Sequence, residues 1–391
     1  MSEPADLPLV DSDSHVTEPA DLWTSRVSRK WGDDVPHLEW DQATGQRKWQ
    51  VGRYRLFGEA IYAMAGWPDF PPSHPKSLDE ADRGAWDATA RLQRLDEYGI
   101  YAQVLYPNLV AFSTHAFTAL DPNLAIDCVR AYNDFIAEFA AADPARLIPI
   151  MMLPFWDGDA SAAELERATA LGHRGVLLAA DPTRAGLPPL WDDYWAPVLA
   201  MAEERALPIN FHIGFNQDPE ELAAKAGADG PHHTRINSVG MLSNARAVSD
   251  MICTGVCARF PDLKIVSVES GAGWLPYLLE SLDWHWKSYG GFRDRPDMEL
   301  PSFYLRRQIY GTFWFEEEAF RRCAEVLPDN LMFETDFPHP TSLSPGPASP
   351  ADRPREMAER ATAGLPDALV RKVFYETAAS LYRIPIPVGA A

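Results

Sequence analysis

Eight short, nearly unbroken apolar runs recur along the chain, and stretches with helical periodicity separate them. Each run is rich in Val, Ile, Leu, Phe or Tyr, as expected of strands buried on both faces of a parallel sheet. The predicted strands are Pro8–Asp13, Ala102–Tyr106, Leu147–Leu153, Gly175–Ala179, Pro208–His212, Lys264–Glu269, Gln308–Thr312 and Asn330–Thr335. The predicted helices are Trp86–Tyr98, Leu124–Ala142, Ala160–Leu171, Tyr194–Arg205, Ile236–Phe260, Trp274–Lys287 and Glu317–Val326. This alternation predicts an α/β fold, a TIM-like (β/α)8 barrel.

Two segments interrupt the alternation. Trp40–Met64, which contains RKWQVGRYRLFG, alternates like a β-hairpin and follows the first predicted strand. Thr341–Pro354 is rich in Pro and Ser and predicts a loop after the eighth strand. The strand and helix pattern resumes after each segment. We therefore expect a single barrel domain over residues 1–391, with an insertion around residues 40–64.

The charge of the chain excludes some classes of partner. It has 35 Lys and Arg residues and 56 Asp and Glu residues, a formal net charge of −21. This negative charge argues against binding nucleic acid or an anionic membrane surface. No segment offers the roughly 20 apolar residues of a membrane span, and the first residues do not form a signal peptide, so a cytoplasmic location is expected. The four cysteines, Cys128, Cys253, Cys257 and Cys323, are too few for a disulfide framework, and Cys253 and Cys257 are expected to share a helix face and pack in the core.

Ligand-type side chains stand at the ends of four predicted strands. Asp13 and His15 end the first strand, His212 the fifth, Glu269 the sixth and Asp336 the eighth. Residues two apart on a strand point the same way, so the first two can share an ion. In such barrels the active site lies at the carboxyl ends of the strands. A metal site built from these five residues is therefore predicted, although each residue taken alone is more often structural.

Further candidates lie near the same strand ends. Glu18 and His339 are ligand-capable, and with the five residues above they make four carboxylates and three imidazoles. That number exceeds what one Zn²⁺ needs and suits two ions, because anions packed so closely repel one another unless cations lie between them. Asp11 is expected to support the site or cap it. For His115, lining the pocket and a structural role are equally expected. His232–His233 are expected in a solvated loop.

Four segments carry a family resemblance: DSDSHVTEPADLW, FHIGF, ESGAGWLPYLLESLDW and TDFPHP. Together they resemble the amidohydrolase-related group that includes aminocarboxymuconate-semialdehyde decarboxylase and resorcylate decarboxylase. The resemblance implies metal ligands at Asp13, His15, His212 and Asp336. The chain departs from the usual pattern, since Asp13 replaces the first His of a His-x-His pair and Glu269 replaces a catalytic His. The Lys that commonly follows the fourth strand is absent from GVLLAADP.

The altered pattern resembles a smaller branch of the group, typified by the non-heme diiron monooxygenase of platensimycin and platencin biosynthesis. This resemblance implies two Fe ions, dioxygen and an external electron donor, with Glu269 and Asp336 as catalytic residues. The implied reaction hydroxylates a C–H bond of an apolar, diterpenoid substrate tethered to coenzyme A. Four arginines near the seventh strand are the candidates for binding the phosphates of coenzyme A: Arg293, Arg295, Arg306 and Arg307.

Two other functions stay open at this point. The first is a decarboxylase or hydrolase that acts on a small carboxylic acid with a single Zn or Mn ion. For the metal content, a Mn/Fe pair is an alternative to two Fe ions. The second is a non-catalytic partner barrel. A homo-oligomer is compatible with each of them, and the sequence determines neither the substrate nor the electron donor.

Overall fold

The computed structural model describes residues 7–215 and 229–387. One three-stranded sheet has the order β1-β5-β6, and a six-stranded sheet has the order β12-β11-β10-β9-β8-β7. All neighbouring pairs in both sheets are parallel. The bounds are β1 Val10–His15, β5 Ala102–Tyr106, β6 Leu147–Pro149, β7 Met151–Met152, β8 Val176–Leu177, β9 Ile209–His212, β10 Ile265–Val268, β11 Ile309–Phe313 and β12 Leu331–Phe333.

The ring of strands closes between β1 and the segment after β12. The His15 N–H donates to the Phe337 carbonyl at 2.6 Å, and the Asp336 N–H donates to the Asp13 carbonyl at 3.0 Å. Because β6 and β7 are consecutive parts of one predicted strand, the ring has the eight predicted strands. The (β/α)8 barrel is therefore confirmed.

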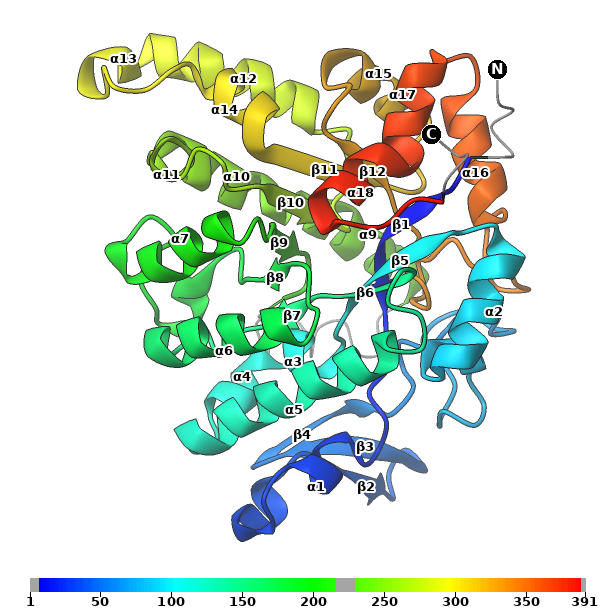
Figure 1. Ribbon diagram of the computed structural model, residues 1–391. Coiled ribbons are helices and arrows are strands. Elements are labelled where there is room, and N and C mark those ends of the chain that lie inside the picture. Colours follow the sequence, from blue (N-terminus) through cyan, green and yellow to red (C-terminus); the bar gives the residue numbers. More distant parts are fainter. Residues whose placement is uncertain (1–6, 216–228, 388–391) are drawn as a thin grey trace.

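Helices surround the strands (Figure 1). The α-helices are α1 Leu22–Arg26, α2 Ala88–Tyr98, α3 Leu109–Phe112, α4 Thr114–Thr118, α5 Pro122–Ala140, α6 Gly158–Ala170, α7 Ala196–Glu204, α9 Gly230–Gly240, α10 Asn244–Cys253, α11 Val256–Arg259, α12 Leu275–Ser288, α13 Gly291–Asp294, α14 Pro301–Gln308, α15 Glu318–Val326, α16 Pro354–Thr362, α17 Asp367–Arg371 and α18 Thr377–Tyr382. Shorter 3-10 and π turns are Arg29–Asp34, Arg83–Ala85, Pro182–Ala185, Asp193–Trp195, Met241–Ser243 and Lys372–Glu376.

Local sequence signals set several helix ends. Asp87 and Asp157 accept hydrogen bonds from backbone N–H groups in the first turns of α2 and α6, as N-cap residues do. Gly99 ends α2 at φ 68°, a conformation that glycine adopts without steric cost. The predicted helix Ile236–Phe260 is three helices in the structure, and Gly255 at φ 90° separates α10 from α11.

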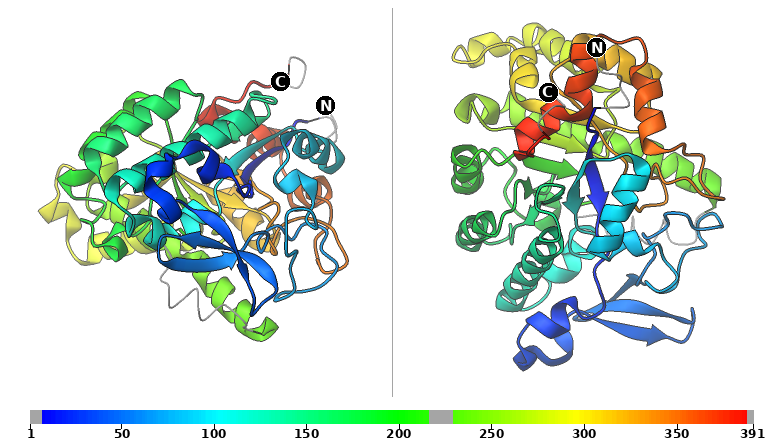
Figure 2. Two further views of the ribbon diagram at one scale, coloured as in Figure 1. Left: turned by 90° about the horizontal axis from the view of Figure 1, so that it is seen from below. Right: turned by 45° about the vertical axis from the view of Figure 1, so that its right-hand side comes forward.

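The insertion after β1 is an antiparallel sheet of three strands, β2 His37–Asp41, β3 Gln46–Val51 and β4 Tyr54–Gly58. It lies beyond the carboxyl end of β1, at the bottom of Figure 1, and Figure 2 shows it from two further sides. Trp49 of β3 is 1% exposed and meets Trp23 of α1 edge to face at 5.3 Å. The buried indole pair attaches the insertion to the barrel.

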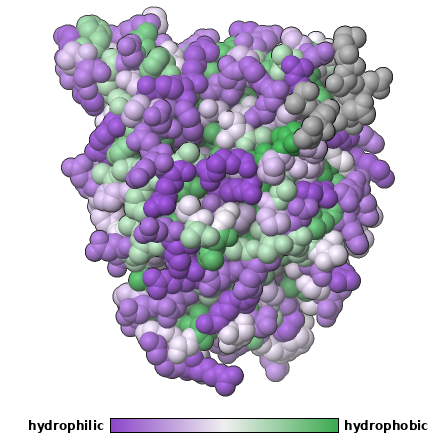
Figure 3. Space-filling model, viewed as in Figure 1, coloured by the Kyte–Doolittle hydropathy of each residue, from purple (hydrophilic) through white to green (hydrophobic). Residues whose placement is uncertain are grey.

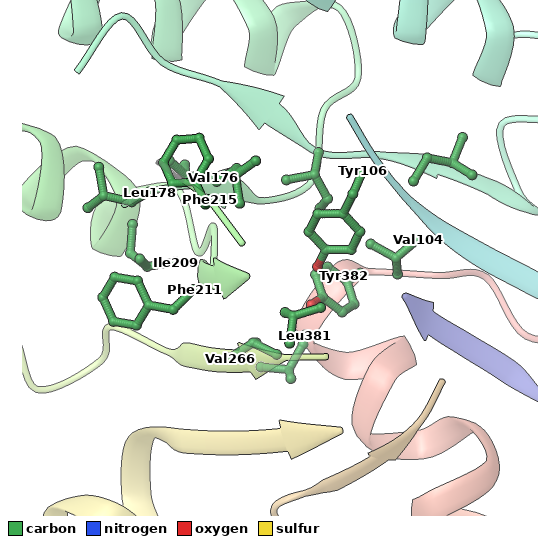
Figure 4. Close-up of a cluster of buried hydrophobic side chains, with 14 of the residues drawn as sticks. Val104, Tyr106, Val176, Leu178, Ile209, Phe211, Phe215, Val266, Leu381 and Tyr382 are labelled. Atoms are coloured by element: carbon green, nitrogen blue, oxygen red, sulfur yellow. The ribbon is translucent and has the colours of Figure 1, made fainter. Parts of the chain in front are cut away.

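Buried apolar side chains cluster around the barrel strands, as Figure 4 shows for Val176, Ile209 and Val266. Two buried hydroxyls lie among them. Tyr106 of β5 and Tyr382 of α18 both donate to the Oδ1 atom of Asn210, at 3.0 and 2.7 Å. The C-terminal helix, which the sequence pattern did not predict, thus contributes a ring and a hydrogen bond to the barrel interior.

Hydrophilic residues cover most of the face shown in Figure 3, with apolar residues scattered between them. Within residues 7–215 and 229–387, no helix combines the length and the apolar character that crossing a bilayer requires.

Candidate metal centre

The carboxyl ends of β1, β9 and β10 and the loop after β12 bring six ligand-type side chains together. In each of two overlapping groups, the ligand atoms all lie within 4.8 Å of one another. The first group is Asp13, His15, His212 and Glu269, and the second is His15, Glu269, Asp336 and His339. All six residues are buried. Four strand ends that are far apart in sequence therefore form one buried centre of ligand-type side chains.

Two imidazoles of this centre face each other with unprotonated nitrogens. The Nδ1 atom of His15 lies 3.0 Å from the Pro107 carbonyl, and the Nδ1 atom of His212 lies 2.6 Å from the Ile213 carbonyl. A carbonyl oxygen only accepts hydrogen bonds, so in the neutral imidazoles we assign the ring proton to Nδ1 and a lone pair to Nε2. The two Nε2 atoms are 3.1 Å apart. Facing lone pairs repel, and a metal ion that accepts both removes this repulsion.

His339 shows a similar arrangement, with the roles of its two ring nitrogens exchanged. Its Nε2 atom lies 2.7 Å from the Oδ1 atom of Asn108, an acceptor, while Nδ1 lies 2.7 Å from the Oδ1 atom of Asp336. If Nε2 carries the proton, Nδ1 and the carboxylate oxygen are both acceptors at close range. Burial lowers the pKa of His339 to about 4, so the neutral ring is the stable form. This contact also fits a bound cation.

The carboxylate of Asp13 is the strongest sign of a missing positive charge. It is 0% exposed, and neither of its oxygens has a hydrogen-bond partner. Its Oδ1 atom lies 3.4 Å from Nε2 of His212 and 3.6 Å from Nε2 of His15. Burial, followed by the carboxylates of Asp336 and Glu269, raises the pKa of Asp13 well above its usual range. A divalent cation would supply the charge and the bonds that this group lacks, so the donors present fit a metal ion.

Backbone strain coincides with two of the candidate ligands. Glu269 has φ 51° and Asp336 has φ 58°, values that side-chain-bearing residues seldom adopt. Such conformations cost about 1–3 kcal/mol each and concentrate at functional sites. The Glu269 N–H donates to the Oε2 atom of Glu334 at 3.2 Å, which helps to hold the turn.

Three supporting residues were missed as site residues in the sequence. Glu334 is 0% exposed, and burial and the charge of Asp13 raise its pKa. Asn108 holds His339, and Arg91 donates to the carbonyls of His15 and Gly84. Glu334 had a visible signal, since it stands at the end of the eighth predicted strand. Arg91 had none, because on a helix its charge resembles that of a solvated residue.

Asp11 acts as a support of the strands. Its carboxylate accepts hydrogen bonds from the Thr335 N–H and hydroxyl and from the Gln103 amide, which joins β1 to its two neighbours. Burial outweighs these bonds and raises the pKa of Asp11 to about 7.

Glu18 lies outside both groups of candidate ligands, and its expected role as a ligand stays a prediction. Its Oε1 atom accepts the N–H groups of Asn108 at 3.0 Å and of Leu109 at 2.8 Å, at the start of α3. It lies in neither group of candidate ligands. The physical reason is that the chain has left β1 three residues after His15, so that this carboxylate reaches the neighbouring loop after β5.

The four arginines that were expected to bind coenzyme A lie away from the candidate metal ligands. Arg293 and Arg295 lie on and just after α13, and Arg306 and Arg307 lie on α14, at the end of the molecule opposite the insertion (Figure 1). α14 leads into the amino end of β11, whereas the candidate ligands stand at carboxyl ends. Local acceptors engage three of them: Arg295 pairs with Asp297, Arg306 donates to the Val326 carbonyl, and Arg307 donates to the Cys257 carbonyl.

The remaining candidates have structural surroundings. His115 lies on α4, where its ring meets Tyr54 edge to face at 5.4 Å. The pair His232–His233 lies on α9 rather than in the expected loop. The four cysteines are free, as expected of cysteines outside a disulfide framework.

Comparison with known proteins identifies the family. The sequence pattern of the amidohydrolase family matches residues 10–384. The 2-amino-3-carboxymuconate-6-semialdehyde decarboxylase of Dictyostelium discoideum is 27% identical over 281 residues, covering 69% of this chain and 72% of that protein. The gamma-resorcylate decarboxylase of Polaromonas sp. is 28% identical over 296 residues, covering 72% of this chain and 84% of that protein.

Solved structures share the fold. An amidohydrolase from Mycobacterium avium subsp. paratuberculosis superposes with a TM-score of 0.76 at 20% identity, covering 96% of this chain and 99% of that one. The 5-carboxyvanillate decarboxylase of Sphingomonas paucimobilis has a TM-score of 0.64 at 22% identity, covering 97% and 100%. The dihydroxybenzoic acid decarboxylase of Polaromonas sp., with bound manganese, has a TM-score of 0.61 at 19% identity, covering 97% and 98%.

These relatives overturn the expectation of a dinuclear iron monooxygenase. The curated proteins that the chain matches are decarboxylases. That expectation treated Glu18 and Glu269 as the carboxylates that complete a second iron position. Glu18 instead caps α3, so one of the two carboxylates behind the inference is engaged elsewhere.

The family pattern begins at the first residue of β1 and ends beyond α18, so it spans the whole barrel. The barrel in turn places ligand-type side chains at the strand ends where that fold carries its active sites. The chain therefore belongs to the amidohydrolase family.

Proposed function

We propose that this protein is a metal-dependent decarboxylase that acts on a small carboxylic acid. One observation carries the proposal: the Nε2 atoms of His15 and His212 lie 3.1 Å apart at the strand ends, beside a buried Asp13 carboxylate that has no hydrogen-bond partner. This centre occurs in a chain whose curated relatives include gamma-resorcylate decarboxylase and aminocarboxymuconate-semialdehyde decarboxylase. The activity and the substrate class of those relatives support the proposal by kinship.

We assign the metal to Asp13, His15, His212 and Asp336, the ligands that the family resemblance implies; they come from the two overlapping groups, which share His15. The Nε2 atom of His15 lies 3.6 Å from carboxylate oxygens of both Asp13 and Asp336, so it stands between the two acids. A set of two imidazoles and two carboxylates suits Mn²⁺, Fe²⁺ or Zn²⁺, and manganese is the ion bound in the Polaromonas structure. When bound, the ion would neutralise the acidic centre and polarise the carboxylate of the substrate.

The reaction also needs a proton donor. Breaking the bond between the substrate carbon and its carboxyl group releases carbon dioxide and leaves an electron pair on that carbon, which must then accept a proton. We assign this role to Glu269, whose Oε2 atom lies 3.7 Å from Nε2 of His212 and whose side chain belongs to both groups of candidate ligands. At 6% exposure this residue is largely screened from bulk water. A carboxylic acid can transfer this proton as a general acid.

The surroundings of the centre suit an apolar substrate body. The ring of Tyr106 lies 5.2 Å from that of His212, and the ring of Phe112 lies 5.8 Å from that of His15. Thr341 donates to the Oδ2 atom of Asp336 at 2.9 Å, which orients this ligand toward His15. The chain thus offers a polar floor for a carboxylate and aromatic walls for the group that carries it.

The proposal is tested with protein stripped by a chelator and reloaded with Mn²⁺, Zn²⁺ or Fe²⁺ separately. Carbon dioxide release is measured without oxygen from gamma-resorcylate, 5-carboxyvanillate and related acids. We expect release that depends on the metal, and a loss of about 100-fold or more in Glu269→Gln with full metal content. Glu280→Gln, on the exposed side of α12, is the matched control. The proposal fails if the metal-loaded protein decarboxylates none of these acids.

A further inference from the structure

One aromatic ring touches all three imidazoles of the centre. The ring centroid of Phe112 lies 5.8 Å from His15, 6.1 Å from His212 and 5.8 Å from His339. Phe112 therefore lies at nearly the same distance from all three imidazoles. Its side chain is 6% exposed, so the ring occupies this position as a packed side chain.

Chain topology shows on which side of the centre this ring lies. Phe112 is the last residue of α3, and α3 follows the carboxyl end of β5. A residue beyond the strand ends covers the open side of a barrel site, whereas residues on the strands form its floor. Phe112 therefore lies between the imidazoles and the direction from which a substrate enters.

A second ring extends this cover toward the insertion. Tyr62, just after β4, lies 5.2 Å from Phe112 and 5.3 Å from His339, and Phe57 of β4 lies 5.0 Å from Tyr62. These separations are typical of packed aromatic pairs. The rings form a continuous row from the centre of the imidazole triangle to the insertion sheet.

Backbone hydrogen bonds hold Tyr62 beside the metal centre. The N–H groups of Met64 and Ala65 both donate to the Pro338 carbonyl, at 2.8 and 3.1 Å. Pro338 stands between Asp336 and His339, so the segment that carries Tyr62 is attached to the same loop as two candidate ligands. Ala60 and Ala63, on either side of Tyr62, are fully buried.

We propose that Phe112, supported by the ring of Tyr62, is the residue that limits the size of molecule admitted to the metal centre. The substrate must bring its reacting group to the imidazoles, and a bulky group attached next to it meets the Phe112 ring. A smaller side chain at this position admits larger ligands, and a larger one excludes them. The inference rests on the proposed metal centre, and it names a role in specificity that the decarboxylase proposal does not require.

The test uses ligand binding, so that it does not depend on turnover. Co²⁺-loaded protein is titrated with azide as the small probe and benzohydroxamate as the bulky one, and the visible absorbance of Co²⁺ reports binding. We expect Phe112→Ala to improve benzohydroxamate affinity about tenfold relative to azide, the order that size discrimination in an apolar pocket reaches. Phe112→Trp should shift the ratio the opposite way. Tyr62→Phe, which keeps the ring, should leave it unchanged, and Tyr62→Ala should shift it as Phe112→Ala does.

Controls separate this role from damage to the site. Phe70→Ala removes a phenyl ring that is 63% exposed and should change neither affinity. Cobalt content is measured for every variant, and Phe112→Leu serves as a second variant if Phe112→Ala binds too little metal. An unchanged affinity ratio in metal-loaded Phe112→Ala, or in Phe112→Leu where that variant replaces it, would overturn the inference. The expected ratios in a protein that releases no carbon dioxide would refute the decarboxylase proposal alone.

Discussion

Replacing Glu18 distinguishes a helix cap from a metal ligand. Its carboxylate accepts two N–H groups at the start of α3 and lies outside both candidate ligand groups. Glu18→Ala would leave two buried donors unpaired, at about 1–3 kcal/mol each, or roughly 2–6 kcal/mol of a total stability of about 5–15 kcal/mol. Glu18→Gln keeps an acceptor oxygen in the same place, so we expect it to fold and to retain its metal.

The pH dependence of stability gives the sharper test. Burial raises the pKa of Glu18 from 4.5 to about 7. A carboxyl group whose pKa is raised in the folded state contributes stability below about pH 4.5, and that contribution is lost as the pH rises through about 7. The shift corresponds to about 3 kcal/mol. The free energy of unfolding of metal-free wild-type protein should therefore fall more steeply between about pH 5 and about pH 8 than that of Glu18→Gln.

Urea unfolding at the two pH values, combined with metal analysis, measures both effects. Comparing the two proteins cancels the contributions of other buried acids, Asp11 among them. Equal slopes in the two proteins, together with loss of metal from Glu18→Gln, would show that this carboxylate is a ligand and that the assignment as a cap is wrong.

Three further predictions concern the metal centre and its surroundings. Asp13→Asn should lose metal and activity. It should also raise the melting temperature of the metal-free protein by several degrees, because it removes a buried carboxylate that has no hydrogen-bond partner. A lower melting temperature, measured by calorimetry, would count against this. Removing the metal from the wild-type protein with a chelator should lower its melting temperature, and adding Mn²⁺ should restore it. A melting temperature that changes with neither treatment would argue against a bound metal. Arg306→Gln should leave KM and metal content unchanged, since this residue lies at the opposite end of the barrel. An increase in KM would show that Arg306 contributes to substrate binding.

The strand ends could be predicted because their chemistry is local. Asp13, His15, His212 and Asp336 follow apolar runs directly, and the rule that parallel barrels carry their sites at carboxyl ends needs no coordinates. Glu18 shows the limit of this reasoning, because whether a carboxylate beyond a strand reaches an ion or a helix depends on the path of the chain. The same limit applies to the arginines, since nearness to a strand in sequence does not show at which end of that strand a residue lies.

The sequence by itself determined the βα repeat, the number of barrel strands and most of the ligand-type residues at their ends. These features depend on the period of the apolar pattern and on residue type, and both are properties of short segments. Only the tertiary structure decided that the Nε2 atoms of His15 and His212 face each other, that Asn108 contacts His339 and that Phe112 lies against all three imidazoles. Each of these contacts joins residues from different elements, and their separation depends on how the whole ring of strands closes.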